Sequence, residues 1–220
     1  MNSDKSRFIK LCIDSRILRF GEFTLKSGRV SPYFFNAGLF NNGQLLGELA
    51  TAYAALIVET LAAKLDSFML YGPAYKGIPL AASTAVQLAK KFEINVPYAF
   101  NRKEPKDHGE GGLIVGAPLQ GNVVIIDDVI TAGTSVSESV KIIDAAGADT
   151  AAVVIALDRQ EITEKEKLSA VEAIEQEHDI PVYAIIELED LISHLQADSE
   201  NYKYADAVIN YRDCYGAKKN

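Results

Sequence analysis

Residues 123 to 135 are the stretch that most constrains the fold of this chain. They open with Val-Val-Ile-Ile, a β-branched run typical of a strand buried on both faces, as in a parallel sheet covered by helices. The acids Asp127 and Asp128 end this strand. They are therefore expected at the carboxyl edge of the sheet, where open α/β folds bind their ligands. The stretch predicts an α/β fold with a site at that edge.

A loop rich in hydroxyl groups follows the two acids. Residues 131 to 135 read Thr-Ala-Gly-Thr-Ser, and the spacing beyond them predicts a helix up to Ala146. The N-terminus of a helix offers free N–H groups and a positive dipole end, which suits a phosphate monoester. The acids would repel a phosphate, so they are expected to face sugar hydroxyls or a hydrated Mg²⁺. Helix capping alone would explain the loop, but not its combination with the strand and the acid pair.

The stretch lacks the glycine patterns of P-loops and of dinucleotide folds. It resembles the phosphoribosyl pyrophosphate (PRPP) signature of the type I phosphoribosyltransferases. The resemblance implies the fold of that family, a mostly parallel twisted sheet flanked by helices with a small N-terminal hood at residues 1–40, within a single domain over residues 1–220. It also implies PRPP binding by Asp127, Asp128, Val129, Ile130, Thr131, Ala132, Gly133, Thr134 and Ser135.

Composition narrows the class of protein. The net charge of −8 argues against a general nucleic-acid binder, which would need a basic surface. A polyanionic substrate must then be held by local clusters of Lys and Arg. No apolar run is long enough to cross a bilayer, and the polar N-terminal residues lack a secretion signal. We therefore expect a cytoplasmic protein without membrane contact. Cys12 and Cys214 match no metal spacing and are expected as free thiols.

The N-terminal part predicts a short helix within residues 2 to 19 and then a β-hairpin at 20–25 and 31–36, apart from the main sheet. Phe34 and Phe35 would point to opposite faces. One ring could stack on a planar base, although core packing would also explain the pair. The run from residue 23 to 38 resembles the hood of the orotate phosphoribosyltransferases, of the single-function type found in bacteria and fungi. This resemblance implies orotate binding by Lys26, Phe34, Phe35, Thr131 and Arg159.

Residues 67 to 77 predict a second core strand and a loop, with a helix up to Phe92 after it. An ordinary strand-to-helix turn would account for the loop. In the family this position holds the pyrophosphate of PRPP, and Tyr75 and Lys76 match its binding residues. The relatives often carry a cis peptide bond here, so one is predicted near Ala74.

Residues 102 to 112 are rich in charge and glycine and predict a hydrated, mobile loop between two strands. A solvated linker would explain this composition. The loop also matches the lid that closes over the pyrophosphate in orotate phosphoribosyltransferases. The resemblance implies PRPP binding by Arg102, Lys103, Lys106 and His108. It further implies a homodimer, in which Lys103, Lys106 and His108 serve the site of the neighbouring subunit.

The C-terminal part predicts one more core strand at 151–157, with Arg159 just beyond its carboxyl end, where it could bind a carboxylate or a surface acid. The spacing further on predicts a helix from residue 169 that carries an exposed His178, and then an outer strand at 181–186. Two short helices are expected at 187–196 and 202–215.

The implied reaction transfers the phosphoribosyl group from PRPP to orotate and gives orotidine 5′-monophosphate and pyrophosphate, a step of pyrimidine synthesis. The expected catalytic residues are Lys106, His108, Asp127 and Asp128, which act by positioning and electrostatic stabilisation. Mg²⁺ would be bound mainly through PRPP, and whether any side chain also contacts it directly stays open. Two alternatives stay open: a transferase for hypoxanthine or uracil, and a PRPP-sensing regulator that binds nucleic acid. A fused enzyme that also decarboxylates the product would need many more residues.

Overall fold

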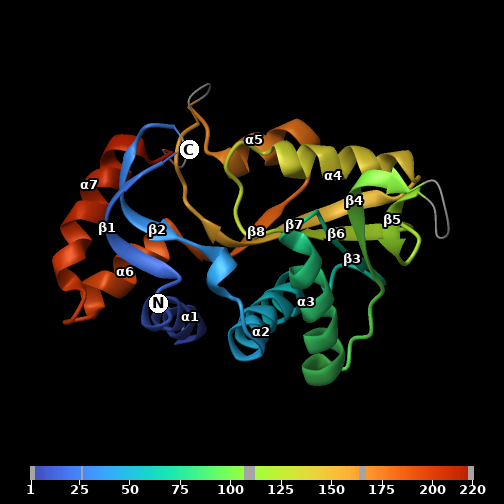
Figure 1. The fold of residues 1–220 in the computed structure, drawn as a ribbon, viewed down its shortest axis with the longest axis horizontal. Helices are drawn as coiled ribbons and strands as arrows, with labels where there is room; N and C mark the ends of the chain where they lie inside the picture. Colours follow the sequence, from blue (N-terminus) through green and yellow to red (C-terminus); the bar gives the residue numbers. More distant parts are fainter. Residues whose placement is uncertain (1–2, 26, 107–111, 164–166, 218–220) are drawn as a thin grey trace.

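The computed structural model of the chain describes residues 3–25, 27–106, 112–163 and 167–217. Its main sheet consists of β3 (Met69–Gly72), β4 (Tyr98–Lys106), β5 (Gly112–Gly116), β6 (Asn122–Ile126), β7 (Asp149–Asp158) and β8 (Val182–Glu187). The strands lie in the order β5-β4-β3-β6-β7-β8 (Figure 1). Neighbours run parallel except β5, which is antiparallel to β4. The predicted α/β fold with a mostly parallel sheet is confirmed.

Helices cover both faces of this sheet. They are α1 (Ser3–Asp14), α2 (Gly43–Thr60), α3 (Gly77–Phe92), α4 (Thr134–Ala145), α5 (Ala170–His178) and α6 (Leu188–Ala197), whereas α7 (Ala205–Tyr215) packs against α6. In β6, Val124 and Ile126 pack with α2 and α3, whereas Val123 and Ile125 pack with α4 and α5. All four side chains are fully buried, as the β-branched run predicts. No helix within the described ranges is long and apolar enough to span a membrane.

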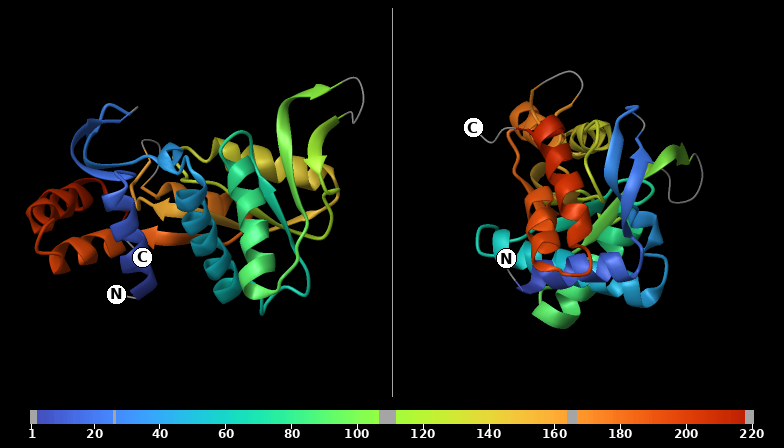
Figure 2. Two further views of the ribbon diagram at one scale, coloured as in Figure 1. Left: turned by 60° about the horizontal axis from the view of Figure 1, so that its bottom comes forward. Right: turned by 90° about the vertical axis from the view of Figure 1, so that its left-hand side faces the viewer.

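The predicted hairpin forms a second, two-stranded sheet that is separate from the main one. It consists of β1 (Leu18–Thr24) and β2 (Val30–Phe35), which pair antiparallel. β1 packs against α1 and β2 packs against α7, so the N-terminal and C-terminal helices together support this hood (Figures 1 and 2). The hood also lies beside the carboxyl end of β7, because Arg159, just beyond that strand, donates to the hydroxyl of Ser31 on β2 at 3.3 Å.

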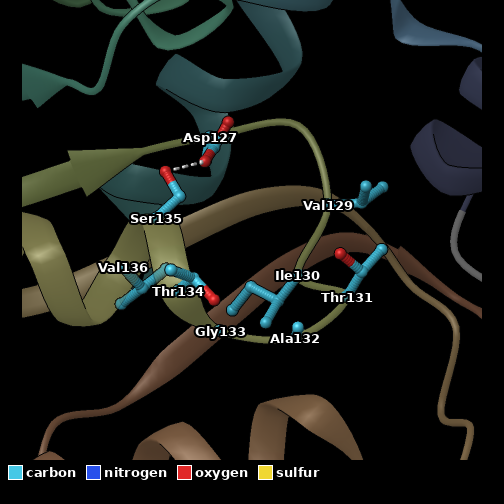
Figure 3. A pocket seen from close by; sticks show the side chains of 9 residues that line it. All are labelled: Asp127, Val129, Ile130, Thr131, Ala132, Gly133, Thr134, Ser135 and Val136. Carbon is cyan, nitrogen blue, oxygen red and sulfur yellow. Dashed lines mark hydrogen bonds between the residues drawn. The ribbon is translucent and has the colours of Figure 1, made fainter. Parts of the chain in front are cut away.

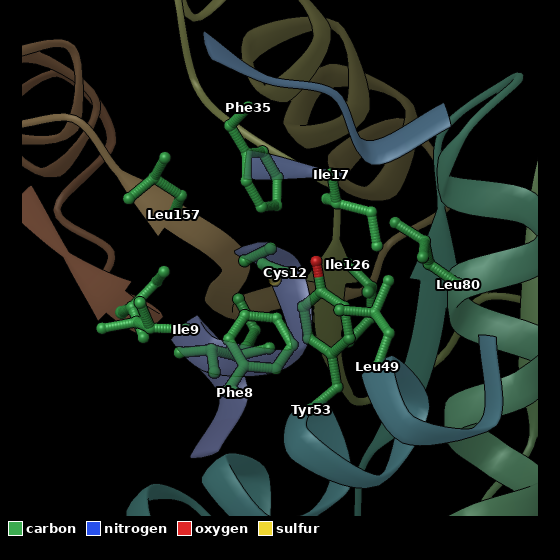
Figure 4. Packing of buried hydrophobic residues seen from close by; sticks show 14 of the residues in the cluster. Phe8, Ile9, Cys12, Ile17, Phe35, Leu49, Tyr53, Leu80, Ile126 and Leu157 are labelled. Carbon is green, nitrogen blue, oxygen red and sulfur yellow. The ribbon is translucent and has the colours of Figure 1, made fainter. Parts of the chain in front are cut away.

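One core cluster joins the hood to the main sheet (Figure 4). Ile9 and Cys12 of α1, Phe35 of β2 and Tyr53 of α2 all belong to this cluster, together with Ile126 of β6. Because these side chains come from four different elements, the hood cannot shift without disturbing the core beneath the acid pair. Both cysteines are free thiols, as predicted.

The segment expected to be a loop from residue 102 is partly a strand. β4 continues to Lys106 and pairs with β5, with Asn101 opposite Ile114 and Lys106 opposite Gly112. The prediction was wrong for 102–106 because an antiparallel ribbon is held by backbone hydrogen bonds and needs no apolar side chains. Lys103 and Glu104 are exposed on it. Residues 107–111, which include His108, lie outside the described residues.

His178 is not exposed, contrary to the prediction. Its side chain is only 12% exposed, because the imidazole Nε2 lies 2.9 Å from the hydroxyl of Ser137 on α4. The spacing of apolar residues within α5 predicts only that a helix forms. It cannot predict that Ser137 of α4 lies against the imidazole.

Candidate active site

β6 delivers the two acids to the carboxyl edge of the sheet. Asp127 and Asp128 are 8% and 6% exposed. The amide of Asp127 donates to the carbonyl of Val154 at 3.1 Å, and the amide of Ala156 donates to the carbonyl of Asp128 at 2.9 Å. From the other side, the buried hydroxyl of Tyr53 donates to the carbonyl of Asp127 at 2.7 Å. The backbone that carries both carboxylates is thus fixed by β7 and α2.

The two carboxylates connect two different loops. Ser135 donates its hydroxyl to Asp127 Oδ2 at 3.1 Å (Figure 3), and the amide of Asp128 donates to Asp127 Oδ1 at 2.9 Å. Asp128 Oδ2 lies 2.6 Å from the ammonium of Lys76, in the loop between β3 and α3. The acid pair therefore lies between the hydroxyl-rich loop and the loop expected to hold pyrophosphate.

Burial is the main influence on the protonation of Asp127. It raises the pKa of Asp127 from 3.8 to about 6, and the negative charge of Asp128 adds to this, while the hydrogen bonds from the Asp128 amide and from Ser135 oppose it. At neutral pH the carboxyl of Asp127 is therefore largely ionised and can accept hydrogen bonds from sugar hydroxyls. Within the described ranges no group of three or more His, Cys, Asp or Glu is placed to hold a metal ion. The two carboxylates nevertheless suit a hydrated Mg²⁺ that arrives on a phosphorylated substrate.

The hydroxyl-rich loop forms a hollow at the start of α4. Asp127 and residues 129–136 line a cavity of about 250 Å³ (Figure 3). Gly133 precedes the helix with φ 72°, and no side-chain cap is described for the first N–H groups of α4. A Cβ at Gly133 would also come within 2.8 Å of Ile174, so glycine is required here on two counts. Free N–H groups around a small hollow form a cradle for a phosphate.

The loop between β3 and α3 lies on the other side of the acid pair. The peptide bond between Ala74 and Tyr75 is cis, as predicted. The amide of Ala74 donates to the side-chain oxygen of Asn101 on β4 at 3.0 Å. Tyr75 is 67% exposed and the side chain of Lys76 is 62% exposed, so both are accessible to a ligand.

Two glycines allow this loop to close tightly. A Cβ at Gly72 would lie within 2.1 Å of the carbonyl oxygen of Gly77, which is backbone that cannot move aside cheaply. Gly72→Ala is therefore expected to lower the free energy of unfolding by roughly 2 kcal/mol or more. Urea denaturation measures the effect. Gly43→Ala is the control, because nothing lies within 4 Å of its added methyl group; an equal loss in both variants would contradict the explanation.

The base of the expected lid lies over the same loop. Lys103 Nζ is 5.0 Å from the ring centre of Tyr75 in the same chain, and Arg102 donates to the carbonyl of Gly112 across the ribbon at 3.2 Å. Lys106 is described by its backbone alone. The structure thus places Lys103 against the loop that carries Tyr75, whereas Arg102 is directed across the ribbon.

The hood residues separate as the alternation predicts. Phe35 points into the core and is 9% exposed, with its ring 6.4 Å from that of Phe40. Phe34 is half-buried on the opposite face, where its ring stacks on Phe23 at 5.5 Å. Lys26 lies outside the described residues.

Arg159 connects the end of β7 to the hood. Its Nη2 donates to Glu161 Oε1 at 2.6 Å and to the hydroxyl of Ser31 at 3.3 Å, and its guanidinium lies 4.5 Å from the ring centre of Tyr33. The sequence left open whether Arg159 binds a ligand carboxylate or a surface acid. In the structure its acid partner is Glu161, and the two side chains are only 14% and 12% exposed. Sequence patterns missed four residues that support the site: Tyr53, Asn101, Ser31 and Glu161.

Comparison with known proteins agrees with this geometry. Residues 39–185 match the phosphoribosyl transferase domain family. The chain is 57% identical over 216 residues to the orotate phosphoribosyltransferase of Marinobacter nauticus and 53% identical over 216 residues to that of Pseudomonas aeruginosa, in both cases across 98% of this chain and 100% of the relative. The orotate phosphoribosyltransferase structure of Francisella tularensis has a TM-score of 0.85 at 43% identity, covering 96% of this chain and 99% of that one. Leishmania donovani UMP synthase shares the fold, with a TM-score of 0.71 at 23% identity, covering 94% of this chain and 42% of that one.

Proposed function

Because the chain belongs to the orotate phosphoribosyltransferase family, we propose that it transfers the phosphoribosyl group of PRPP to orotate. The products are orotidine 5′-monophosphate and pyrophosphate, a step of pyrimidine biosynthesis. The observation that carries the proposal is the 57% identity to a relative over its whole length, hood included. The acid pair beside a phosphate-sized cradle supports it independently.

In the proposed complex the 5′-phosphate lies in the cradle formed by residues 131 to 135. The carboxylates of Asp127 and Asp128 accept hydrogen bonds from the ribose hydroxyls and stabilise the positive charge that develops at the ribose C1 as pyrophosphate leaves. Mg²⁺ carried by PRPP would neutralise part of the pyrophosphate charge. Val129 and Ile130 complete the wall of the cradle.

The pyrophosphate and the base occupy the two sides of the acid pair. Lys76 and the lid cations balance the charge of the leaving group, and a closed lid excludes water that would hydrolyse PRPP. Orotate lies between the hood and the sheet, with its carboxylate on Arg159. The proposed leaving-group contacts are Tyr75, Lys76, Arg102, Lys103, Lys106 and His108. The proposed orotate contacts are Lys26, Phe34, Thr131 and Arg159, together with the backbone of Phe35, since the ring of Phe35 is buried in the core.

The first test follows orotate absorbance after addition of PRPP, with and without Mg²⁺, and with hypoxanthine and uracil as competing bases. Metal-dependent consumption of orotate alone is the expected result. Turnover of another base in place of orotate would keep the PRPP site and remove the base assignments. Absence of any turnover would favour a PRPP-sensing regulator, although the net charge of −8 is unfavourable for nucleic-acid binding.

We further propose that residues 1–220 form one domain that assembles into a cytoplasmic homodimer, in which the lid completes the site of the neighbouring subunit. The position of the β4–β5 ribbon supports this arrangement. Its described part lies at one edge of the main sheet (Figure 2), where it could extend towards a second copy.

Co-expression of two inactive variants with different affinity tags tests whether the lid acts between subunits. Lys106→Ala removes a lid cation, and Asp128→Asn removes a sugar-binding carboxylate. A hybrid dimer has one site with both intact groups only if the lid crosses the interface. In that case, about a quarter of the wild-type kcat/KM is expected from a random mixture, because half the dimers are hybrids and each has one intact site.

The purified hybrid provides the control. If each lid closed over its own site, neither site of the hybrid would be intact and its activity would stay at the level of the parent variants. A dimer in which both subunits carry Lys106→Ala and the two different tags gives the residual activity of the parent variant in the same tagged form. Size-exclusion chromatography of the wild type measures the dimer itself.

A further inference from the structure

Glu161 lies at the centre of a buried polar cluster that joins the hood to the main sheet. Its Oε1 accepts from Arg159 Nη2 at 2.6 Å and from the hydroxyl of Tyr33 at 3.2 Å. The Glu161 side chain is 12% exposed, and Tyr33 on β2 is fully buried. The carboxylate is thus shared by one residue after β7 and one residue of the hood.

The backbone around Glu161 is held from two sides. The amide of Ile162 donates to the carbonyl of Tyr215 at 2.8 Å, and Glu161 forms an isolated antiparallel bridge with Gly216. The guanidinium of Arg29, from the hood turn, donates to the carbonyl of Ile162 at 2.9 Å. The C-terminal end of the chain and the hood therefore both fix the segment that carries Glu161.

These contacts leave Arg159 only one orientation. Its guanidinium lies over the ring of Tyr33, and its Nη2 donates to both Ser31 and Glu161. A carboxylate prefers bidentate pairing with the planar fork of arginine, so the fixed plane of this guanidinium decides how a carboxylate can bind to it. A guanidinium that is 14% exposed also needs a nearby negative charge, since an unpaired buried charge is strongly unfavourable.

We propose that Glu161 is a positioning residue that orients Arg159 for the carboxylate of orotate. This inference rests on the proposed function, because it assigns the orotate carboxylate to Arg159. Glu161 does not contact the substrate itself. It fixes the plane of the guanidinium before orotate arrives, so that binding does not have to order a long flexible side chain.

Glu161→Gln tests the proposal, because it removes the charge and keeps an oxygen acceptor. The KM for orotate is expected to rise about 10-fold, since charge-assisted hydrogen bonds are roughly twice as strong as neutral ones, while the KM for PRPP changes less than about twofold. The same change in an Arg159→Ala background is expected to add nothing, because Glu161 acts only through that arginine. Tyr33→Phe removes one donor to Glu161 and is expected to raise the orotate KM by about threefold.

Glu189→Gln is the matched control. It removes the charge of Glu189 from an Arg–Glu pair with Arg212, in which the Glu189 side chain is half exposed. It is expected to leave both KM values unchanged. A lower orotate KM in Glu161→Gln would show that Glu161 competes with the substrate and would overturn the proposal. An equal rise in both KM values, or a full additional loss in the Arg159→Ala background, would also overturn it. Failure of the wild type to consume orotate would instead refute the proposed function, so the two failures are distinguishable.

Discussion

Asp127→Asn is expected to give a protein that is more stable than the wild type at pH 8 and roughly 10²-fold or more lower in kcat/KM. Asp127 is buried beside Asp128, and both effects raise its pKa from 3.8 to about 6. Asparagine keeps the size of the side chain and an oxygen acceptor, but it removes the buried negative charge. In the proposed mechanism the variant loses the charge that stabilises the ribose C1, so its activity falls. It also no longer has to keep a negative charge buried, so its free energy of unfolding rises.

The pH dependence follows from the direction of the shift. The folded carboxyl holds its proton more tightly than the unfolded one, so the wild type loses stability as the pH rises from about 4 to about 6. Above that window the loss is complete and amounts to roughly 3 kcal/mol, since each pKa unit corresponds to about 1.4 kcal/mol. Asparagine does not titrate, so the advantage of the variant is expected to be absent below pH 4 and full at pH 8.

Urea denaturation at several pH values between 4 and 8 measures this difference. Asp144→Asn on the exposed side of α4 is the control and is expected to show no comparable pH-dependent gain. In the wild type, kcat/KM is expected to fall as the pH drops through about 6, because a protonated Asp127 loses an acceptor for the ribose hydroxyls. A variant that is less stable than the wild type at pH 8 would contradict the assignment of the raised pKa.

The parts of the site that local sequence could predict are those encoded within one short segment. The strand, acid pair and hydroxyl loop at 123–135 carry the burial pattern, the edge position and the anion cradle in consecutive residues, and the structure confirms the first two. Tyr53 and Asn101 could not be found in this way. Each appears in sequence as an ordinary helix or strand residue, and its role depends on a partner 74 or 27 residues away.

The errors have the same origin. His178 is covered by a helix whose position no local pattern encodes, and the polar ribbon after Asn101 is stable because β5 pairs with it. In the sequence, Glu161 is one of several polar residues that follow Arg159, and nothing nearby marks it as part of the site. Only the folded structure places the hydroxyl of Tyr33, 128 residues away, against its carboxylate.

Lys76→Ala is expected to lower kcat/KM by roughly 10²-fold with little loss of stability. Lys76 lies 2.6 Å from Asp128 Oδ2, yet its side chain is 62% exposed, and exposed ion pairs contribute at most about 1 kcal/mol to folding. In the proposed mechanism its ammonium has a larger role, because the charge of pyrophosphate grows as the bond to C1 breaks. Removing it therefore affects the transition state more than the fold.

The same variant also reports on the acid pair. Without the ammonium of Lys76, the charge of Asp128 acts unopposed on Asp127, and a nearby like charge raises the pKa of a carboxyl. The acid limb of kcat/KM is therefore expected to move to higher pH in Lys76→Ala. Lys90→Ala, at the exposed far end of α3, the helix that Lys76 precedes, is expected to change neither the rate nor the pH profile. A limb that stayed in place would mean that Lys76 serves the leaving group alone, whereas a shift shows that one cation controls both the leaving pyrophosphate and the carboxylates that hold the ribose.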